Sequence, residues 1–252
     1  MLALATITPG AAEIFAALQG EGASVGRPSV FVRLSRCNLA CHWCDTAYTW
    51  HFEGDNRPHA DAIAYARADN QLMMDEEAVA ARLRALGGHW PAPRLVITGG
   101  EPLLQGPALA RLAALLADGS GPRWHIEIET NGTVAPHPAL DPRVHQYNVS
   151  PKLAHSGNAA AQALVGERLD AFAADPRAFF KFVVASPDDV EQVRALAAIH
   201  AIPANRLYLM AEGRDSATLR ARQAWLAPLA LEHGYALTDR LHIHLSGDTR
   251  GT

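Results

Sequence analysis

Cysteine is nearly absent from this chain of 252 residues, which contains only Cys37, Cys41 and Cys44. An odd number of cysteines at such short spacing excludes a disulfide framework, because no bridge could join distant segments. Thiolates crowded on one loop are typical of a soft metal centre instead. The cysteines therefore predict a metal-binding loop.

Long apolar runs and an excess of basic charge are missing as well. No run approaches the roughly 18 apolar residues of a membrane span, and a net charge of −4 gives no basic footprint for nucleic acid. Residues 1–6 lack the basic start and apolar core of a signal peptide. A hydrophobic content of 49% is enough for a real core. We therefore expect one cytoplasmic domain over residues 1–252, binding neither nucleic acid nor membrane.

The cysteine spacing favours an iron–sulfur cluster over the other thiol chemistries. Three thiolates on a four-iron cluster leave one iron open to a small molecule, and such a cluster suits a reducing compartment. Zinc bound with His42 is an alternative, but structural zinc sites usually pair two hooks from separated segments. Buried free thiols are another, which the polar surroundings of the loop disfavour.

Strand and helix patterns alternate along the chain, which predicts a parallel sheet covered by helices, as an α/β barrel or an open doubly wound sheet. Residues 51–74 fit neither period and indicate an insertion. Four helices are predicted. The first starts at about Asp75, and the second contains Leu109 and stops near Gly119. The third starts after the cap Ser186, and the fourth spans Ala217–His233. The predicted strands are Ser29–Arg36, Arg94–Thr98, Trp124–Glu129, Val144–Val149, Phe179–Ala185, Arg206–Met210 and Leu241–Leu245.

Polar and glycine-rich turns follow several of these strands: the cysteine loop, Gly99–Pro102, Thr130–Gly132, Ser150–Lys152 and Ala211–Gly213. Each turn taken singly has an ordinary interpretation, since paired glycines are common in turns and lysine is usually solvated. Parallel strands, however, end at one edge of the sheet, where α/β proteins place their sites. The turns are therefore expected to converge above the metal loop.

The spacing C-x-x-x-C-x-x-C, with Trp43 before the last cysteine, resembles the radical S-adenosylmethionine superfamily, and Gly99–Pro102 resembles its glycine-rich motif. Further motifs resemble the 7-carboxy-7-deazaguanine synthases. They are Glu13–Phe15, Leu18–Gly22, Phe31–Arg33, Cys44–Thr46, Thr98–Gln105, Glu129–Thr133 and Ser150–Lys152. The resemblance runs from about residue 10 to the end and is poor over residues 51–74.

This resemblance implies an incomplete parallel α/β barrel, usually a homodimer. It implies a carbon–nitrogen lyase that converts 6-carboxy-5,6,7,8-tetrahydropterin to 7-carboxy-7-deazaguanine with loss of ammonia, in queuosine or 7-deazapurine biosynthesis. The implied cofactors are a [4Fe-4S] cluster, S-adenosyl-L-methionine and Mg²⁺, and the implied electron donor is a protein such as flavodoxin or ferredoxin. Another radical S-adenosylmethionine enzyme, such as a glycyl-radical activase, is the alternative.

The resemblance also assigns residues, none of them a side-chain acid or base, because the cofactor supplies the radical. Cys37, Cys41 and Cys44 would ligate the cluster and Thr46 would bind magnesium, for which its hydroxyl is a suitable hard ligand. The cofactor would contact Trp43, Asp45, Gly100, Ser150, Pro151 and Lys152. The substrate would contact Leu18, Gln19, Gly20, Arg33, Thr98, His242 and Thr252, with the planar fork of Arg33 suited to a carboxylate.

Overall fold

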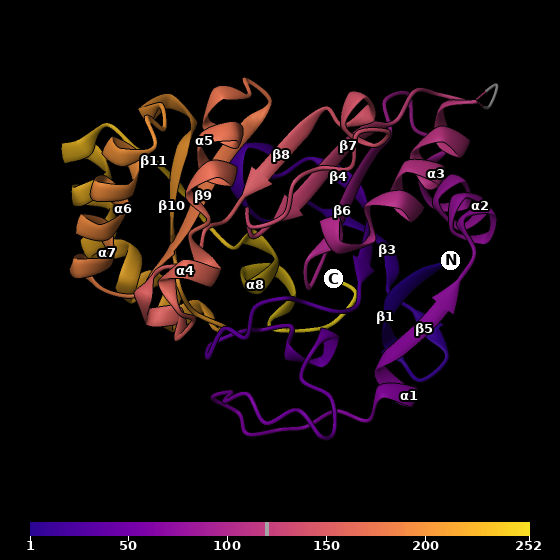
Figure 1. The fold of residues 1–252 in the computed structure, drawn as a ribbon, viewed down its shortest axis with the longest axis horizontal. Coiled ribbons are helices and arrows are strands. Elements are labelled where there is room, and N and C mark those ends of the chain that lie inside the picture. The colour runs from indigo at the N-terminus through magenta and orange to yellow at the C-terminus, as the bar shows by residue number, and fades with distance from the viewer. Residues whose placement is uncertain (119–120) are drawn as a thin grey trace.

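The computed structural model describes residues 1–118 and 121–252 and is built on one mixed sheet (Figure 1). Its strand order is β11-β10-β9-β8-β7-β6-β4-β1-β2, with β3 paired to β4 and β5 to β1. The strands are β1 (Leu2–Thr8), β2 (Ala11–Ala12), β3 (Ile14–Leu18), β4 (Pro28–Leu34), β5 (Gln71–Met74), β6 (Arg94–Gly99), β7 (His125–Thr130), β8 (Gln146–Val149), β9 (Ala178–Val184), β10 (Leu207–Ala211) and β11 (Ala236–Thr238).

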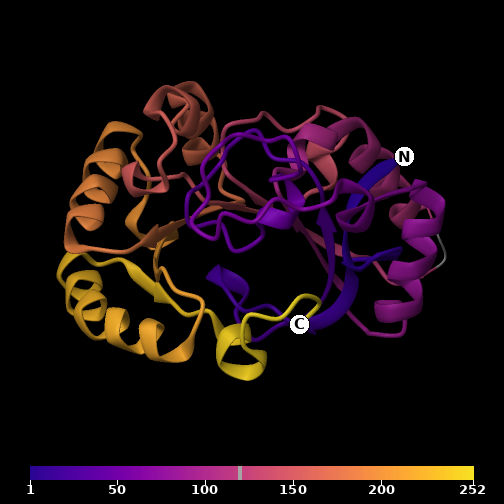
Figure 2. The same ribbon diagram turned by 90° about the horizontal axis from the view of Figure 1, so that it is seen from below.

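From β4 to β11 along this order every neighbouring pair is parallel. The sheet curves around a central space with helices on its outer side and does not close (Figure 2). The predicted incomplete α/β barrel is thus confirmed. The helices are α1 (Arg67–Asn70), α2 (Glu76–Gly87), α3 (Gly106–Ala117), α4 (Ala160–Ala163), α5 (Gly166–Ala174), α6 (Pro187–Ile199), α7 (Ser216–His233) and α8 (Leu241–Ser246).

Local signals set three of the predicted helix ends. The Asp75 side chain caps α2 by accepting from the Ala78 amide at 2.7 Å. Ser186 and Asp189 form a reciprocal capping box at the start of α6. Gly234, at φ 67°, ends α7 in the left-handed conformation that glycine adopts without steric cost. The stop expected near Gly119 lies outside the described residues.

One predicted strand is wrong. Leu241–Leu245 belongs to helix α8, and the edge of the sheet is formed instead by β11, which the sequence did not indicate. The alternation of leucine, isoleucine and histidine suggested a strand. An alternation of five residues is too short to exclude a helix, and here the run forms a helix that buries Ile243 and leaves Leu245 63% exposed.

The antiparallel part of the sheet was not predicted either. Strands β1, β2 and β3 precede the first expected strand, and β5 pairs with β1 in register Leu4↔Leu72. The expected insertion is therefore irregular only over residues 51–66, because residues 67–74 form α1 and β5. Continuous burial over Leu2–Ala5 shows why β1 escapes a period-2 pattern.

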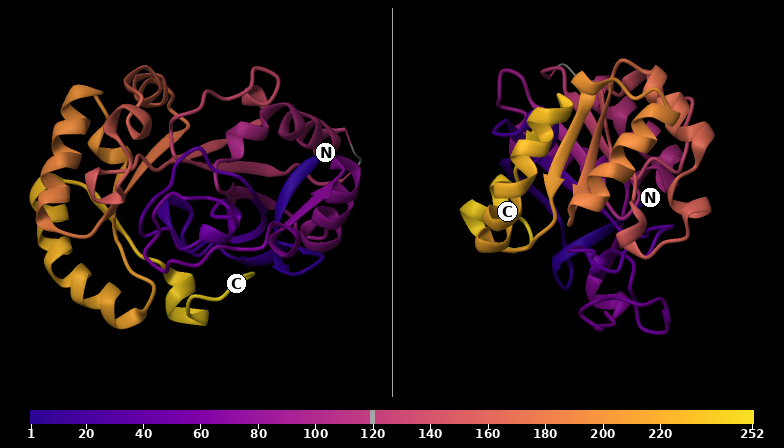
Figure 3. Two further views of the ribbon diagram at one scale, coloured as in Figure 1. Left: turned by 60° about the horizontal axis from the view of Figure 1, so that its bottom comes forward. Right: turned by 90° about the vertical axis from the view of Figure 1, so that its left-hand side faces the viewer.

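The segment after the cysteines crosses the open end of the barrel, at the carboxyl ends of the parallel strands (Figures 2 and 3). Its chain passes close to the last residues, which return beneath the N-terminal strands after α8 (Figure 3). Over the described residues, no helix is long and apolar enough to cross a bilayer. Three parts of the chain that are distant in sequence therefore border the open end of the barrel. They are the segment after the cysteines, the last residues and the N-terminal strands.

Candidate active site

A cavity opens at the carboxyl edge of the sheet, and the turns after several strands contribute to its lining. Of the residues assigned by resemblance, only Pro151 is not in its lining. The others are Leu18, Gln19, Gly20, Arg33, Cys37, Cys41, Trp43, Cys44, Asp45, Thr46, Thr98, Gly100, Ser150, Lys152, His242 and Thr252.

The cysteine loop is tied to the neighbouring strand ends by polar side chains. Asn131 donates to Asn38 Oδ1 at 3.0 Å, and Asn38 donates to Thr133 Oγ1 at 2.8 Å. Beneath them the fully buried carboxylate of Glu101 accepts from the Asn131 amide at 2.7 Å and from Thr130 Oγ1 at 3.0 Å. The turns after β6 and β7 therefore hold the loop by hydrogen bonds that satisfy buried groups.

Each cysteine sulfur has an N–H donor. The Leu39 amide lies 3.5 Å from Cys37 Sγ, and Asn158 Nδ2 lies 3.3 Å from Cys41 Sγ. Trp50 Nε1 lies 3.4 Å from Cys44 Sγ. Donors of this kind stabilise the negative charge of thiolate ligands and tune cluster potentials. The donor set thus fits a cluster held by three thiolates.

Without a bound metal the thiols are protonated, because burial raises the pKa of Cys37 to about 12 and that of Cys41 to about 11. Among the described residues, no group of three or more His, Cys, Asp or Glu side chains is arranged around one ion position. A four-iron cluster places each thiolate on a different iron. Its ligands therefore need not converge on a single point.

Gly99 and Gly100 are required by close backbone packing. A Cβ on Gly99 would collide with the Leu34 carbonyl, and one on Gly100 with the Arg36 carbonyl. Gly99 also has a φ of 131°, which side-chain-bearing residues rarely adopt. The Gly100 amide donates to Leu34 O at 3.1 Å. These glycines therefore let β6 pack closely against the start of the cysteine loop. They also line the cavity.

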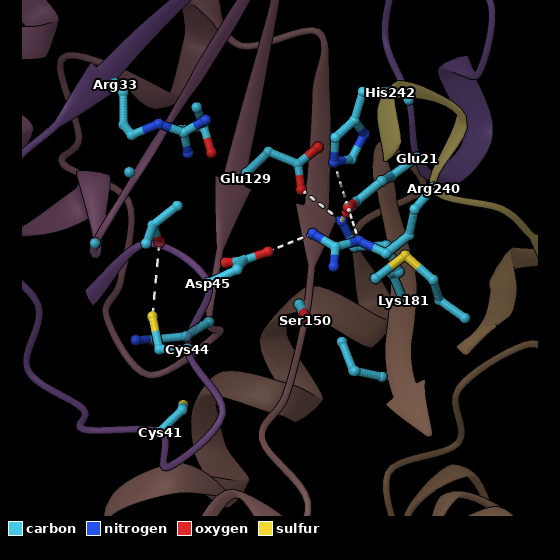
Figure 4. A pocket seen from close by; sticks show the side chains of 18 of the residues that line it. Glu21, Arg33, Cys41, Cys44, Asp45, Glu129, Ser150, Lys181, Arg240 and His242 are labelled. Atoms are coloured by element: carbon cyan, nitrogen blue, oxygen red, sulfur yellow. Dashed lines mark hydrogen bonds and ion pairs between the residues drawn. The ribbon is translucent and has the colours of Figure 1, made fainter. Parts of the chain in front are cut away.

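Two carboxylates, each with a side chain 16% exposed, share Lys181 on the wall opposite the cysteines (Figure 4). Lys181 Nζ lies 2.5 Å from Glu21 Oε2 and 3.0 Å from Glu129 Oε2, with its side chain 7% exposed. Burial by itself raises the pKa of Glu21, but Lys181 and Arg240 outweigh it and hold that pKa far below its ordinary value. Glu21 is therefore charged at neutral pH, and the buried Lys181 has a negatively charged partner.

Arg240 connects this pair to the cysteine side of the cavity. Its guanidinium pairs with Glu21 Oε1 at 3.0 Å and with Asp45, and donates to Gly213 O at 2.6 Å. The residue is only 8% exposed. Nearby His242 has its pKa lowered mainly by burial, although Glu21, 3.9 Å away, raises it. A neutral His242 thus faces the cavity beside a charged network.

Arg33 is held from behind by a buried carboxylate. Glu13 Oε1 accepts from Arg33 Nε at 2.8 Å, and the Tyr48 hydroxyl donates to Glu13 Oε2 at 3.0 Å. Glu13 has no exposed surface, so it is desolvated and available only to these partners. Because Glu13 occupies the Nε side of the guanidinium, Arg33 is fixed in orientation where it lines the cavity.

The cysteine side of the cavity carries a cation and an aromatic ring. Lys152 Nζ lies 6.0 Å from the centre of the Trp43 ring and donates to Ser150 Oγ at 2.8 Å. The Trp43 Nε1 donor is buried without a hydrogen-bond partner among the described residues. A buried donor without a partner is costly.

Sequence reasoning missed five of the residues that build this site: Glu13, Trp50, Asn158, Lys181 and Arg240. Trp50 and Asn158 donate to sulfurs, whereas the other three carry buried charges. Glu13 lay within a quoted motif but received no role. A lysine in the middle of the apolar strand Phe179–Ala185 was the one available signal, because a buried cation needs a partner.

Comparison with known proteins agrees with the fold and the cysteine loop. Residues 32–142 match the model of the radical SAM superfamily. The chain thus has the core of an enzyme class that uses S-adenosylmethionine with an iron–sulfur cluster. It is similar in fold to a solved structure described as QueE from Escherichia coli, with a TM-score of 0.64, 26% identity and coverage of 91% and 92% of the two chains.

Relatives narrow the class further. The chain is 40% identical over 245 residues to the 7-carboxy-7-deazaguanine synthase of Pyrobaculum aerophilum, covering 95% of each protein. It is 36% identical to that of Halobacterium salinarum, covering 95% of this chain and 91% of the relative. The chain belongs to the 7-carboxy-7-deazaguanine synthase family, and the resemblance inferred from its motifs is confirmed.

Proposed function

We propose that the protein converts 6-carboxy-5,6,7,8-tetrahydropterin to 7-carboxy-7-deazaguanine with loss of ammonia, in queuosine or 7-deazapurine biosynthesis. The observation that carries this proposal is one cavity lined both by three cysteines and by Gln19, Arg33 and His242. The cysteine loop without Gln19, Arg33 and His242 would fit many enzymes of the radical SAM superfamily. Residues 1–252 act as one domain under this proposal.

Three groups of residues divide the work. Cys37, Cys41 and Cys44 hold the [4Fe-4S] cluster, which together with S-adenosylmethionine supplies the radical that starts the reaction. Contacts to that cofactor come from Trp43, Asp45, Gly100, Ser150, Pro151 and Lys152. The backbone N–H and C=O groups of residues 18–20, with Thr98, His242 and Thr252, contact the pterin.

Charge complementarity orients the substrate. The terminal nitrogens of Arg33 bind the substrate carboxylate, because Glu13 already fixes the Nε edge of the guanidinium. Thr46, whose Oγ1 lies 3.6 Å from Cys44 Sγ, offers an oxygen ligand to Mg²⁺ between the cluster loop and the substrate. The protein thereby positions the reactants and excludes water, while the cofactor supplies the chemistry.

The setting of the enzyme is inferred from its family. It works as a homodimer in the cytoplasm and takes electrons from a reducing protein such as flavodoxin or ferredoxin. These statements rest on the resemblance alone.

An anaerobic assay tests the proposal. The protein is reconstituted with iron and sulfide, reduced, and mixed with S-adenosylmethionine, Mg²⁺ and 6-carboxytetrahydropterin, and the products are measured by mass spectrometry. We expect 7-carboxy-7-deazaguanine together with 5′-deoxyadenosine. 5′-Deoxyadenosine alone would discard the substrate but keep the class, and neither product from fully loaded protein would discard both. Omitting Mg²⁺ or replacing it with another divalent ion tests the metal separately.

A further inference from the structure

Residues 247–252, here called the tail, end in the cavity but have few contacts of their own. Thr252 lines the cavity, and Gly251 lies against Ile7 of β1. Within the tail, the Thr249 amide donates to Gly247 O at 3.0 Å and Thr252 Oγ1 to Thr249 O at 2.9 Å. Two short-range bonds do not fix a chain end, so its place depends on what it is packed against.

Arg250 is the tail residue with the most partners. Its guanidinium lies 3.5 Å from the ring centre of Tyr48 and 5.7 Å from that of Tyr65. It also donates to Asn70 Oδ1 at 3.0 Å and to Thr6 O at 3.3 Å. Tyr65 and Asn70 both belong to residues 51–74. A planar cation against two rings is held by electrostatic attraction to their faces.

A second arginine joins the same two segments. Arg214 Nη1 lies 2.7 Å from Asp61 Oδ2, and its Nε lies 2.6 Å from Asp248 Oδ2. Asp61 belongs to residues 51–74 and Asp248 to the tail. The three side chains are between 34% and 41% exposed, so water and salt screen these ion pairs. Arg250 is therefore the stronger of the two links.

The Arg250 contact continues into the cavity. The Tyr48 ring under Arg250 carries the hydroxyl that donates to Glu13, and Glu13 in turn accepts from Arg33. Seating the tail therefore restrains, from the outside, the chain of groups that orients Arg33. The close-up shows Arg33 on the side of the cavity above Asp45 and Cys44 (Figure 4).

We propose that residues 51–74 are the seat of the tail, and that Arg250 is a positioning residue which holds Thr252 over the cavity and keeps Arg33 in its substrate-binding orientation. The part that concerns substrate rests on the proposed function. The part that concerns the seat rests on contacts among Arg250, Tyr65, Asn70, Arg214 and Asp61.

Hydrogen exchange on the full chain tests the seat without turnover. Arg250→Ala is expected to speed amide exchange of both the tail and residues 61–70 about tenfold, as loss of a partly buried cation–π contact would. Arg250→Lys, which keeps the charge but not the plane, should fall between this variant and the wild type. Tyr65→Phe, which keeps the ring, should leave exchange unchanged.

Arg177→Ala is the matched control. Arg177 also lies over a tyrosine, 5.3 Å from the ring centre of Tyr147, and also bonds Asp141 and Asp175, but it does not line the cavity. It should leave exchange of the tail unchanged. Unchanged tail exchange in Arg250→Ala would overturn the seat, and so would an equal increase in Arg177→Ala, which would mean general loosening.

Kinetics of the loaded enzyme test the link to substrate. Arg250→Ala should raise the KM for 6-carboxytetrahydropterin about tenfold and leave the KM for S-adenosylmethionine within about twofold. Tyr48→Phe removes the bond to Glu13 but keeps the ring, so it should raise the same KM without speeding tail exchange. Unchanged pterin KM values in both variants would overturn the link. Because exchange needs no substrate, failure of the proposed function leaves the seat test intact.

Discussion

The cysteine loop (residues 37–46) and the segment that follows it (residues 51–74) encode their roles in different ways. The loop carries its chemistry in residue type and spacing, which any observer of the sequence can see. The segment has no such pattern, yet it supports the loop: the Ala60 amide donates to His42 O at 2.9 Å, and His59 Nε2 lies 2.8 Å from Cys44 O. Support depends on contacts, and contacts between distant residues leave little trace in sequence.

The largest expected effect falls on the loop itself. Cys41→Ala should abolish cluster assembly, because two thiolates cannot replace the three that the cluster needs. Iron and sulfide content and the visible absorption of anaerobically reconstituted protein measure this directly.

His42→Ala is the control for the cysteine variant. The side chain of His42 is exposed and lies between two ligands. This variant should retain full iron and sulfide. A loss of metal in both variants, with zinc in the wild type, would restore the zinc interpretation.

The next largest effect concerns the charge network that joins the two sides of the cavity. Arg240→Gln leaves the partly buried Glu21 and Asp45 without their shared cation, and this should reduce the free energy of unfolding by about 2–3 kcal/mol, less than for a fully buried pair because Asp45 is 30% exposed. Urea unfolding followed by circular dichroism measures it.

The exposed pair Arg194–Glu191 supplies the control for that measurement. Arg194→Gln should cost about 0.5 kcal/mol or less. Equal losses in the two variants would show that the buried network contributes nothing beyond a surface pair.

The same network predicts an acid-sensitive stability. The pKa values of Glu21 and Asp45 are lowered in the folded chain from ordinary values of 4.5 and 3.8. Burial raises both, but Lys181 and Arg240 outweigh it at Glu21, and Arg240 and Arg33 outweigh it at Asp45. Their contribution is therefore complete above about pH 4.5 and is lost as pH falls toward the folded pKa values. As the pH is lowered from 7 to 3, the free energy of unfolding should fall steeply in the wild type and less steeply in Arg240→Gln. Parallel slopes would contradict this assignment.

The smallest effect is expected at Trp50, which lies between the loop and the segment and contacts both. Arg57 lies 4.7 Å over the Trp50 ring, and Trp50 donates to Cys44 Sγ. Trp50→Phe removes the donor, so it should make the cluster harder to reduce and lower its potential, on the order of tens of millivolts. Redox titration followed by electron paramagnetic resonance measures the shift. Trp90→Phe is the control. Trp90 packs against the core and does not line the cavity, so this variant should leave the potential of the cluster unchanged.

The predicted strands, helices and turns at the edge of the sheet came from patterns that are local. Strand β7 and helix α6 were found because periodicity and capping act within a few residues. Helix α8 was mistaken for a strand because a short apolar alternation does not say which residues are buried. Strand β1 was missed because burial on both faces removes the alternation.

The sequence by itself determined the cysteine loop, the glycine turn after β6 and the class of enzyme, because ligand spacing and backbone freedom are properties of adjacent residues. Only the tertiary structure decided that Arg240 meets Glu21 and Asp45, 219 and 195 positions away, and that Arg250 meets Tyr48 and Tyr65. Charges and rings attract any suitable partner. Which partner each one finds is set by the curvature of the open sheet, which brings distant segments to one edge.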